Sequence, residues 1–129
     1  MRSFYRDHMK KGLCTKLITF YSKRLQKDLH LQKWKIKLVV VKSTAKAHQK
    51  LRPPVGHVVA WCDKDIKKKT ALIVILYDKQ PDALEALASL VHEFLHIAVE
   101  PLVVKKESEE KFVLKMERWI MKIHKRAGL

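Results

Sequence analysis

The chain has 129 residues, of which 47% are hydrophobic, so it has enough apolar material for one domain and little more. With only three glycines and four prolines, it is not disordered throughout. The first eleven residues lack the apolar segment of a signal peptide, and no apolar run could span a bilayer. We therefore expect a single domain over residues 1–129 with a cytoplasmic location and no membrane partner.

The charge is strongly unbalanced, because 28 lysines and arginines stand against 13 acidic residues and give a formal net charge of +15. This excess favours encounter with nucleic acid, although a well-solvated surface explains it equally well. No nucleic-acid-binding motif accompanies the charge. The two cysteines, Cys14 and Cys62, form no C-x-x-C pair and do not indicate a disulfide scaffold.

The first half of the chain predicts one helix and one strand. Residues 4–29 carry a hydrophobic side chain every fourth position from Leu13 to Leu29, which is typical of an amphipathic helix. Residues 34–41 begin with strict alternation of apolar and basic residues, which is typical of a half-buried strand. Residues 42–56 are polar and contain two adjacent prolines, so we expect a loop.

The second half predicts a hairpin followed by two helices. Residues 57–61 and 70–77 are expected to pair as strands around a charged turn at 63–69. Asp82 is a suitable N-cap for a helix that reaches Val99, and residues 108–125 form the last helix. The apolar face expected for that last helix comprises Phe112, Val113, Met116, Trp119, Ile120 and Ile123. The predicted fold is α+β, with a small sheet of three or slightly more strands packed on these three helices.

The most informative stretch is His92-Glu93-Phe94-Leu95-His96, which matches the pattern H-E-x-x-H. Residues four apart share one face of a helix, so both imidazoles can reach one zinc ion at about 2.0–2.1 Å. Zinc lowers the pKa of a bound water towards neutrality, and Glu93 can act as general base and then general acid. The alternative is a pair of hydrogen-bonded structural histidines with Glu93 on the surface.

A catalytic zinc site needs a third protein ligand. A metzincin is excluded, because Val99 and Leu102 occupy the positions of its Gly and third His. The last helix region offers five candidates: Glu107, Glu109, Glu110, Glu117 and His124. Glu110 and Glu109 both border the predicted apolar face near the start of the helix, and either could instead be an acid that favours the helix dipole.

The motif, the pair Glu109-Glu110 and the amphipathic helix after them resemble the gluzincins. The resemblance covers residues 70–123 and is strongest to the single-domain minigluzincins and to small metallopeptidase-like proteins of phages. It implies Glu110 as third ligand, or Glu109 if the register differs by one. It also implies that strand 71–77 or its hairpin partner forms the upper edge of a substrate cleft.

The resemblance implies a zinc metallopeptidase that binds one Zn²⁺ and cleaves a peptide or protein substrate. Larger gluzincins stabilise the oxyanion with a Tyr or His, but no Tyr follows Tyr77 here, which leaves His124 or His57 for that role. Two alternatives stay open. One is an SprT-like protease acting on DNA-bound proteins, whose usual third ligand is His. The other is a catalytically weak, zinc-stabilised binding module.

Overall fold

The computed structural model describes residues 10–54, 56, 58–99 and 106–126. Its main elements are α1 (Lys11–Asp28), β1 (Lys35–Val41), β2 (Ala60–Asp65), β3 (Thr70–Leu76), α2 (Ala83–Val99) and α3 (Lys106–Arg126). Three single-turn 3₁₀ helices also occur: η2 (Thr44–Lys46), η3 (Gln49–Leu51) and η4 (Tyr77–Lys79). The predicted α+β class is confirmed. We predicted a helix over residues 4–29, and the structure has one from Lys11 to Asp28. Residues 4–9 of the predicted helix lie outside the described part of the chain.

The three strands form one mixed sheet in the order β1-β3-β2. β3 lies in the centre, parallel to β1 and antiparallel to β2. Ile73, Val74 and Ile75 of β3 have no exposed surface, as expected for a strand that is covered on both faces. Because β3 is paired on both sides, it cannot accept another strand, and within the described residues no strand pairs with the outer edge of β2.

The predicted hairpin is confirmed, but its first strand is displaced along the chain. We predicted residues 57–61, whereas β2 runs from Ala60 to Asp65 and the turn is correspondingly shorter. Charged residues are tolerated here because β2 is an edge strand and its charges have partners. Arg52 pairs with Asp63 at 3.7 Å, and Lys64 reaches two oxygen atoms described below.

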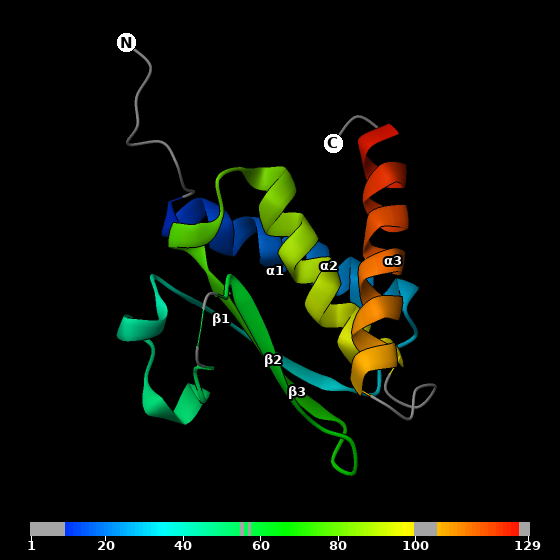
Figure 1. Cartoon of the computed structure of the whole chain (residues 1–129), viewed down its shortest axis with the longest axis horizontal. Helices are drawn as coiled ribbons and strands as arrows, with labels where there is room; N and C mark the ends of the chain where they lie inside the picture. The colour runs from blue at the N-terminus through cyan, green and yellow to red at the C-terminus, as the bar shows by residue number, and fades with distance from the viewer. Residues whose placement is uncertain (1–9, 55, 57, 100–105, 127–129) are drawn as a thin grey trace.

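The helices build the main core on one face of the sheet (Figure 1). α1 contributes Cys14, Ile18 and Leu25, and α2 contributes a wider buried face that includes Leu90 and Phe94. α3 packs on α2 through Val113, which is fully buried. The prediction that Phe112 and Trp119 belong to the apolar face of α3 is wrong: they are 42% and 59% exposed.

The opposite face of the sheet is covered by the connection between β1 and β2. A second cluster forms there around Trp61, Val74 and Leu76, and Ala47 and Leu51 pack against it. The indole nitrogen of Trp61 donates a hydrogen bond to the Leu51 carbonyl at 2.8 Å. The described residues of this connection therefore lie on the opposite side of the sheet from α2 (Figure 1).

Both cysteines, Cys14 and Cys62, are free thiols. Burial raises the pKa of Cys14 to about 11. Burial, together with nearby Glu93, raises the pKa of Cys62 to about 12. Both side chains therefore stay protonated and serve as small packing residues. Among the described residues, no helix combines the length and apolar character needed to cross a membrane.

Candidate metal centre

α2 is held firmly enough to present side chains in fixed positions. Asp82 caps its start, since an Asp82 carboxylate oxygen accepts a hydrogen bond from the Glu85 backbone N–H at 2.9 Å. Its buried face includes Leu90, Phe94 and Ile97, each with no exposed surface. The helix runs without a break to Val99, so the two motif histidines lie one turn apart on the face that meets α3.

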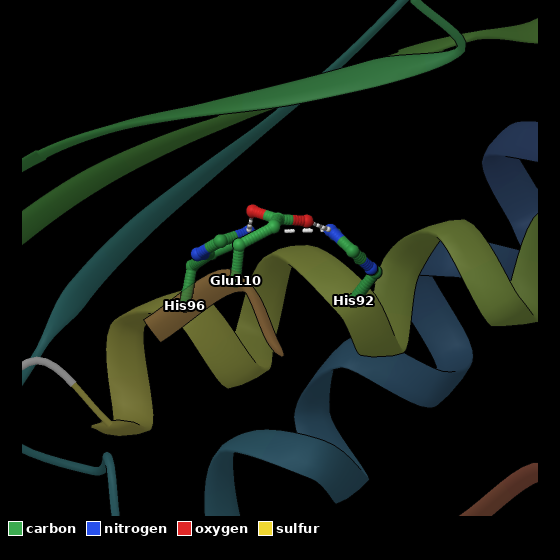
Figure 2. A group of neighbouring side chains, drawn as sticks. All are labelled: His92, His96 and Glu110. Carbon is green, nitrogen blue, oxygen red and sulfur yellow. Dashed lines mark hydrogen bonds and ion pairs between the residues drawn. The ribbon is translucent and has the colours of Figure 1, made fainter. Parts of the chain in front are cut away.

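The histidines converge on one carboxylate from α3. The Nε2 atoms of His92 and His96 are 3.2 Å apart. One oxygen of Glu110 lies 3.0 Å from His92 Nε2, and the other lies 3.0 Å from His96 Nε2. Figure 2 shows Glu110 lying across the two imidazole rings, with one oxygen directed to each. Of the two glutamates left open by the sequence, the structure brings Glu110 to both Nε2 atoms.

The other ring nitrogen of each histidine also meets a carboxylate. His92 Nδ1 lies 2.5 Å from an oxygen of Glu117, and His96 Nδ1 lies 3.2 Å from an oxygen of Glu109. Carboxylate oxygens thus face both nitrogens of each ring, and the hydrogen bond to Glu117 is the main cause that raises the pKa of His92. A neutral imidazole with its proton on Nδ1 has a lone pair on Nε2, and this is the form in which the two rings would bind a metal.

These donor atoms fit a metal ion. His92, His96 and Glu110 each offer one ligand atom, all within 4.8 Å of one another, and this group could hold a metal. In a tetrahedral site with zinc bonds of about 2.0–2.1 Å, neighbouring ligand atoms lie about 3.3–3.4 Å apart. The ligand atoms here are separated by 3.0–3.2 Å, which is close to that distance. Half of the Glu110 side chain is exposed, so the group has access to solvent on that side.

Glu109 takes a different role from Glu110, although the two are neighbours. Lys64 Nζ donates to Glu109 at 2.7 Å and to the backbone oxygen of His96 at the same distance. Burial would raise the pKa of Glu109, but its hydrogen bonds from Lys64 and His96 outweigh this and lower the pKa. The ionised Glu109 therefore contacts His96 at Nδ1, the ring nitrogen away from Glu110, and Lys64 balances the charge of Glu109.

Glu93 is buried beside this cluster and is only 7% exposed. Its pKa is raised to about 7, mainly by burial and also by the nearby Glu110 and Glu117, while His92 and Lys64 oppose the rise. Glu93 is also close enough to Cys62 on β2 to raise the pKa of that thiol. Glu93 is therefore a buried carboxyl group beside His92 in the chain, with a pKa at which it can exchange a proton near neutral pH.

The predicted oxyanion residues are not placed. His57 lies outside the described residues, and His124 belongs to α3 but its side chain is not among those described. The side chain of Glu107, a further candidate ligand, is likewise outside the described set.

The sequence missed two supporting residues. Glu117 was only one of five candidate ligands, and Lys64 was expected in a turn. The sequence spacing could have predicted that Glu117 lies near Glu110. Glu117 follows Glu110 by seven residues, about two helical turns, so the two share one side of α3. Lys64 follows Cys62 by two residues, which places it on the helix-facing side of β2.

A hollow of about 360 Å³ adjoins the cluster between α2 and α3. Leu84, Ala88 and Met121 give it apolar walls, and Glu117 belongs to both the hollow and the cluster. Ala88 lies one helical turn before His92, so a group bound at the histidines would have this space beside it.

Comparison of the chain with protein-family models, with curated proteins and with solved structures found no match. The gluzincin resemblance therefore rests on the motif residues of the sequence, and the function below is argued from the geometry of the cluster.

Proposed function

We propose that the protein is a zinc-dependent peptidase of gluzincin type, with His92, His96 and Glu110 as zinc ligands. The observation that carries this proposal is the directed arrangement of the two imidazoles. Each Nδ1 contacts a carboxylate of its own, and both Nε2 atoms face the same point, where the two oxygens of Glu110 lie. Structural histidines do not require this arrangement, whereas metal-binding histidines usually have it.

The charge of the site supports a divalent cation. Four of the 13 acidic residues of a chain with net charge +15 converge on the two imidazoles: Glu93, Glu109, Glu110 and Glu117. Lys64 compensates Glu109, and the raised pKa of Glu93 reduces its charge near pH 7, so Glu110 and Glu117 are the carboxylates that a cation at the histidines would balance. Like charges held this close destabilise a fold unless a cation balances them.

Zinc is the metal that suits two imidazoles and one carboxylate with an open fourth position. When bound, it would supply Lewis acidity, which lowers the pKa of water and polarises a carbonyl group. Glu93 would remove a proton from the attacking water and pass it to the leaving amine. Glu117 and Glu109 would keep the rings oriented, and the outer edge of β2 offers backbone groups to an extended peptide.

The metal content of purified protein tests the ligand set. We expect about one zinc per chain after reconstitution and dialysis, measured by elemental analysis, with zinc lost in His96→Ala and in Glu110→Gln. Glu109→Gln is the matched control, because it changes the neighbouring carboxylate but keeps an acceptor for His96 Nδ1. Zinc retained in Glu110→Gln and lost in Glu109→Gln would reverse the assignment, and no zinc in the parent protein would refute it.

Activity is tested separately with Glu93→Gln. The zinc-loaded parent should cleave an unfolded protein such as labelled casein, while Glu93→Gln should bind zinc equally well and lose cleavage. A parent that binds zinc but releases no fragments from a broad peptide library would refute the peptidase. That result would favour the zinc-stabilised binding module instead. An SprT-like site would usually have a histidine as its third zinc ligand. Among the described residues, the third member of the cluster is Glu110, which favours the gluzincin type.

A further inference from the structure

The outer face of α1 carries a stripe that neither the core nor the metal centre uses. Its members recur at intervals of three and four residues and therefore share one side of the helix. They are Leu13, Lys16, Phe20, Lys23, Arg24 and Lys27, all exposed. We refer to these six residues as the α1 stripe.

The stripe points away from the rest of the molecule. The buried residues of α1, such as Cys14, Ile18 and Leu25, occupy the opposite side of the helix. Phe20 and Leu13 nevertheless remain 64% and 60% exposed. The Phe20 ring is therefore accessible to a partner molecule.

The stripe has one sign of charge. From residue 10 to residue 27 the chain contains no acidic residue, and Asp28 is the first to follow. A hollow of about 630 Å³ opens around Phe20, and Lys16, Lys23 and Arg24 line it. The Phe20 ring is steadied by an edge-to-face contact with Tyr21, with ring centroids 5.0 Å apart.

We propose that the α1 stripe binds single-stranded nucleic acid, with Phe20 stacking on a base and the surrounding cations contacting phosphates. An exposed aromatic ring among cations provides both contacts that such binding needs. The net charge of +15 adds a long-range attraction for a polyanion. The site shares no residue with the cluster of His92, His96 and Glu110, so the inference is independent of the proposed peptidase.

The stripe fits other anionic partners less well. A duplex stacks its bases internally and offers no free base face to Phe20, so it would use only the cations. Binding in a membrane interface needs a broad apolar face, whereas only Leu13 and Phe20 are apolar here. An acidic peptide has no flat ring system to lie against Phe20.

The proposal is tested by measuring the affinity of the full chain for a labelled 12-nucleotide oligothymidylate. Fluorescence anisotropy gives this affinity at salt concentrations from 50 to 200 mM. Four cations of the stripe, Lys16, Lys23, Arg24 and Lys27, give an expected slope of log K against log salt of about −3 for a single strand. Affinity should therefore fall about 50-fold over this range. Phe20→Ala should weaken binding about 5- to 150-fold, the value of one stacked base.

Two matched controls separate the stripe from general basicity. Trp119→Ala removes another exposed aromatic residue, on α3, and should leave affinity unchanged. Lys16→Glu with Lys23→Glu should reduce the salt slope by about half. Lys35→Glu with Lys37→Glu makes the same change of net charge at exposed positions of β1 and should have a much smaller effect. Circular dichroism checks that each variant keeps its helix content.

Several results would overturn the proposal. They are no binding of the oligonucleotide at 50 mM salt, equal losses in the two double variants, or a larger loss in Trp119→Ala than in Phe20→Ala. Tighter binding to a duplex, to polyglutamate or to phosphatidylserine vesicles than to the single strand would also overturn it in favour of that partner. The metal-free and the zinc-loaded protein should bind the oligonucleotide with the same affinity, because the α1 stripe does not include the metal centre.

Discussion

Replacing Lys64 by methionine tests the support that holds the metal centre together. The change keeps the length of the side chain but removes its charge and its donors. Lys64 Nζ donates to a Glu109 oxygen and to the His96 backbone oxygen, both at 2.7 Å. In Lys64→Met the carboxylate of Glu109 loses its compensating charge, and the end of α2 loses a side-chain contact with β2.

The magnitude follows from burial. The side chains of Lys64 and Glu109 are 19% and 11% exposed, so their ion pair is mostly removed from water. Breaking a fully buried pair costs about 3–5 kcal/mol, and a hydrogen bond to a charged group contributes about 1.5–3 kcal/mol. Because some solvent access remains, we expect Lys64→Met to lower the free energy of unfolding by about 2–4 kcal/mol.

Urea unfolding of metal-free protein, followed by circular dichroism, measures this free energy. Lys67→Met, at an exposed position in the turn after β2, is the control and should change stability by no more than about 0.5 kcal/mol. Glu109→Gln combined with Lys64→Met should cost less than the two single changes added together, because no buried charge is left unpaired. A loss below about 0.5 kcal/mol in Lys64→Met would refute the proposed support.

Four further outcomes are expected. The pKa of Glu109 is lowered in the fold, so its ionised form stabilises the metal-free protein above its ordinary value of 4.5, and this contribution is lost as the pH falls through and below that value; Glu109→Gln should flatten the dependence in urea unfolding at pH 3–6. Glu117→Gln should weaken zinc binding by about 10- to 100-fold in a competition assay with a chelating dye, because it loosens the orientation of His92. Ellman's reagent at pH 8 should label the buried, protonated thiol of Cys14 only after denaturant is added, and rapid labelling of native protein would contradict its burial. Trp61→Ala should destabilise the protein by about 3–5 kcal/mol in thermal unfolding, whereas Trp119→Ala should cost less than about 0.5 kcal/mol.

The position of α2 could be predicted from the sequence because local signals agree there. Asp82 caps the helix as expected, and the helix reaches the predicted Val99, the last residue described before the gap at 100–105. The spacing of His92 and His96 then places both rings on one face, whatever the rest of the chain does. Local chemistry was sufficient for these residues, so the centre of the candidate site was predictable.

β2 was predicted in the wrong place because its charges resemble those of a turn. Asp63, Lys64 and Asp65 follow one another, and such a run usually marks a solvated connection. In the fold they continue an edge strand, where solvent and ion pairs satisfy them. The alternation from Trp61 onward carries the correct signal, but only the partner strand β3 decides between the two interpretations.

The face of α3 was predicted too wide for a similar reason. Its sequence places Phe112 and Trp119 beside Val113, and hydrophobicity alone assigns all three to the core. α3 packs mainly against α2, which covers only a narrow stripe around Val113. The number of neighbours that a helix meets is a property of the whole fold, so the helix sequence does not determine it.

The choice between Glu109 and Glu110 shows where local reasoning ends. Adjacent residues of a helix differ by about 100° in direction, and these two lie on opposite sides of Val113, which packs α3 on α2. Glu110 falls on the same side as Glu117 and meets both Nε2 atoms, while Glu109 falls on the side of Lys64. A rotation of α3 by one residue would exchange these partners. The candidate third ligand therefore depends on the rotation of α3 about its axis, which the packing of Val113 against α2 fixes. This rotation is a property of the packed fold, so the sequence could only narrow the choice to Glu109 and Glu110.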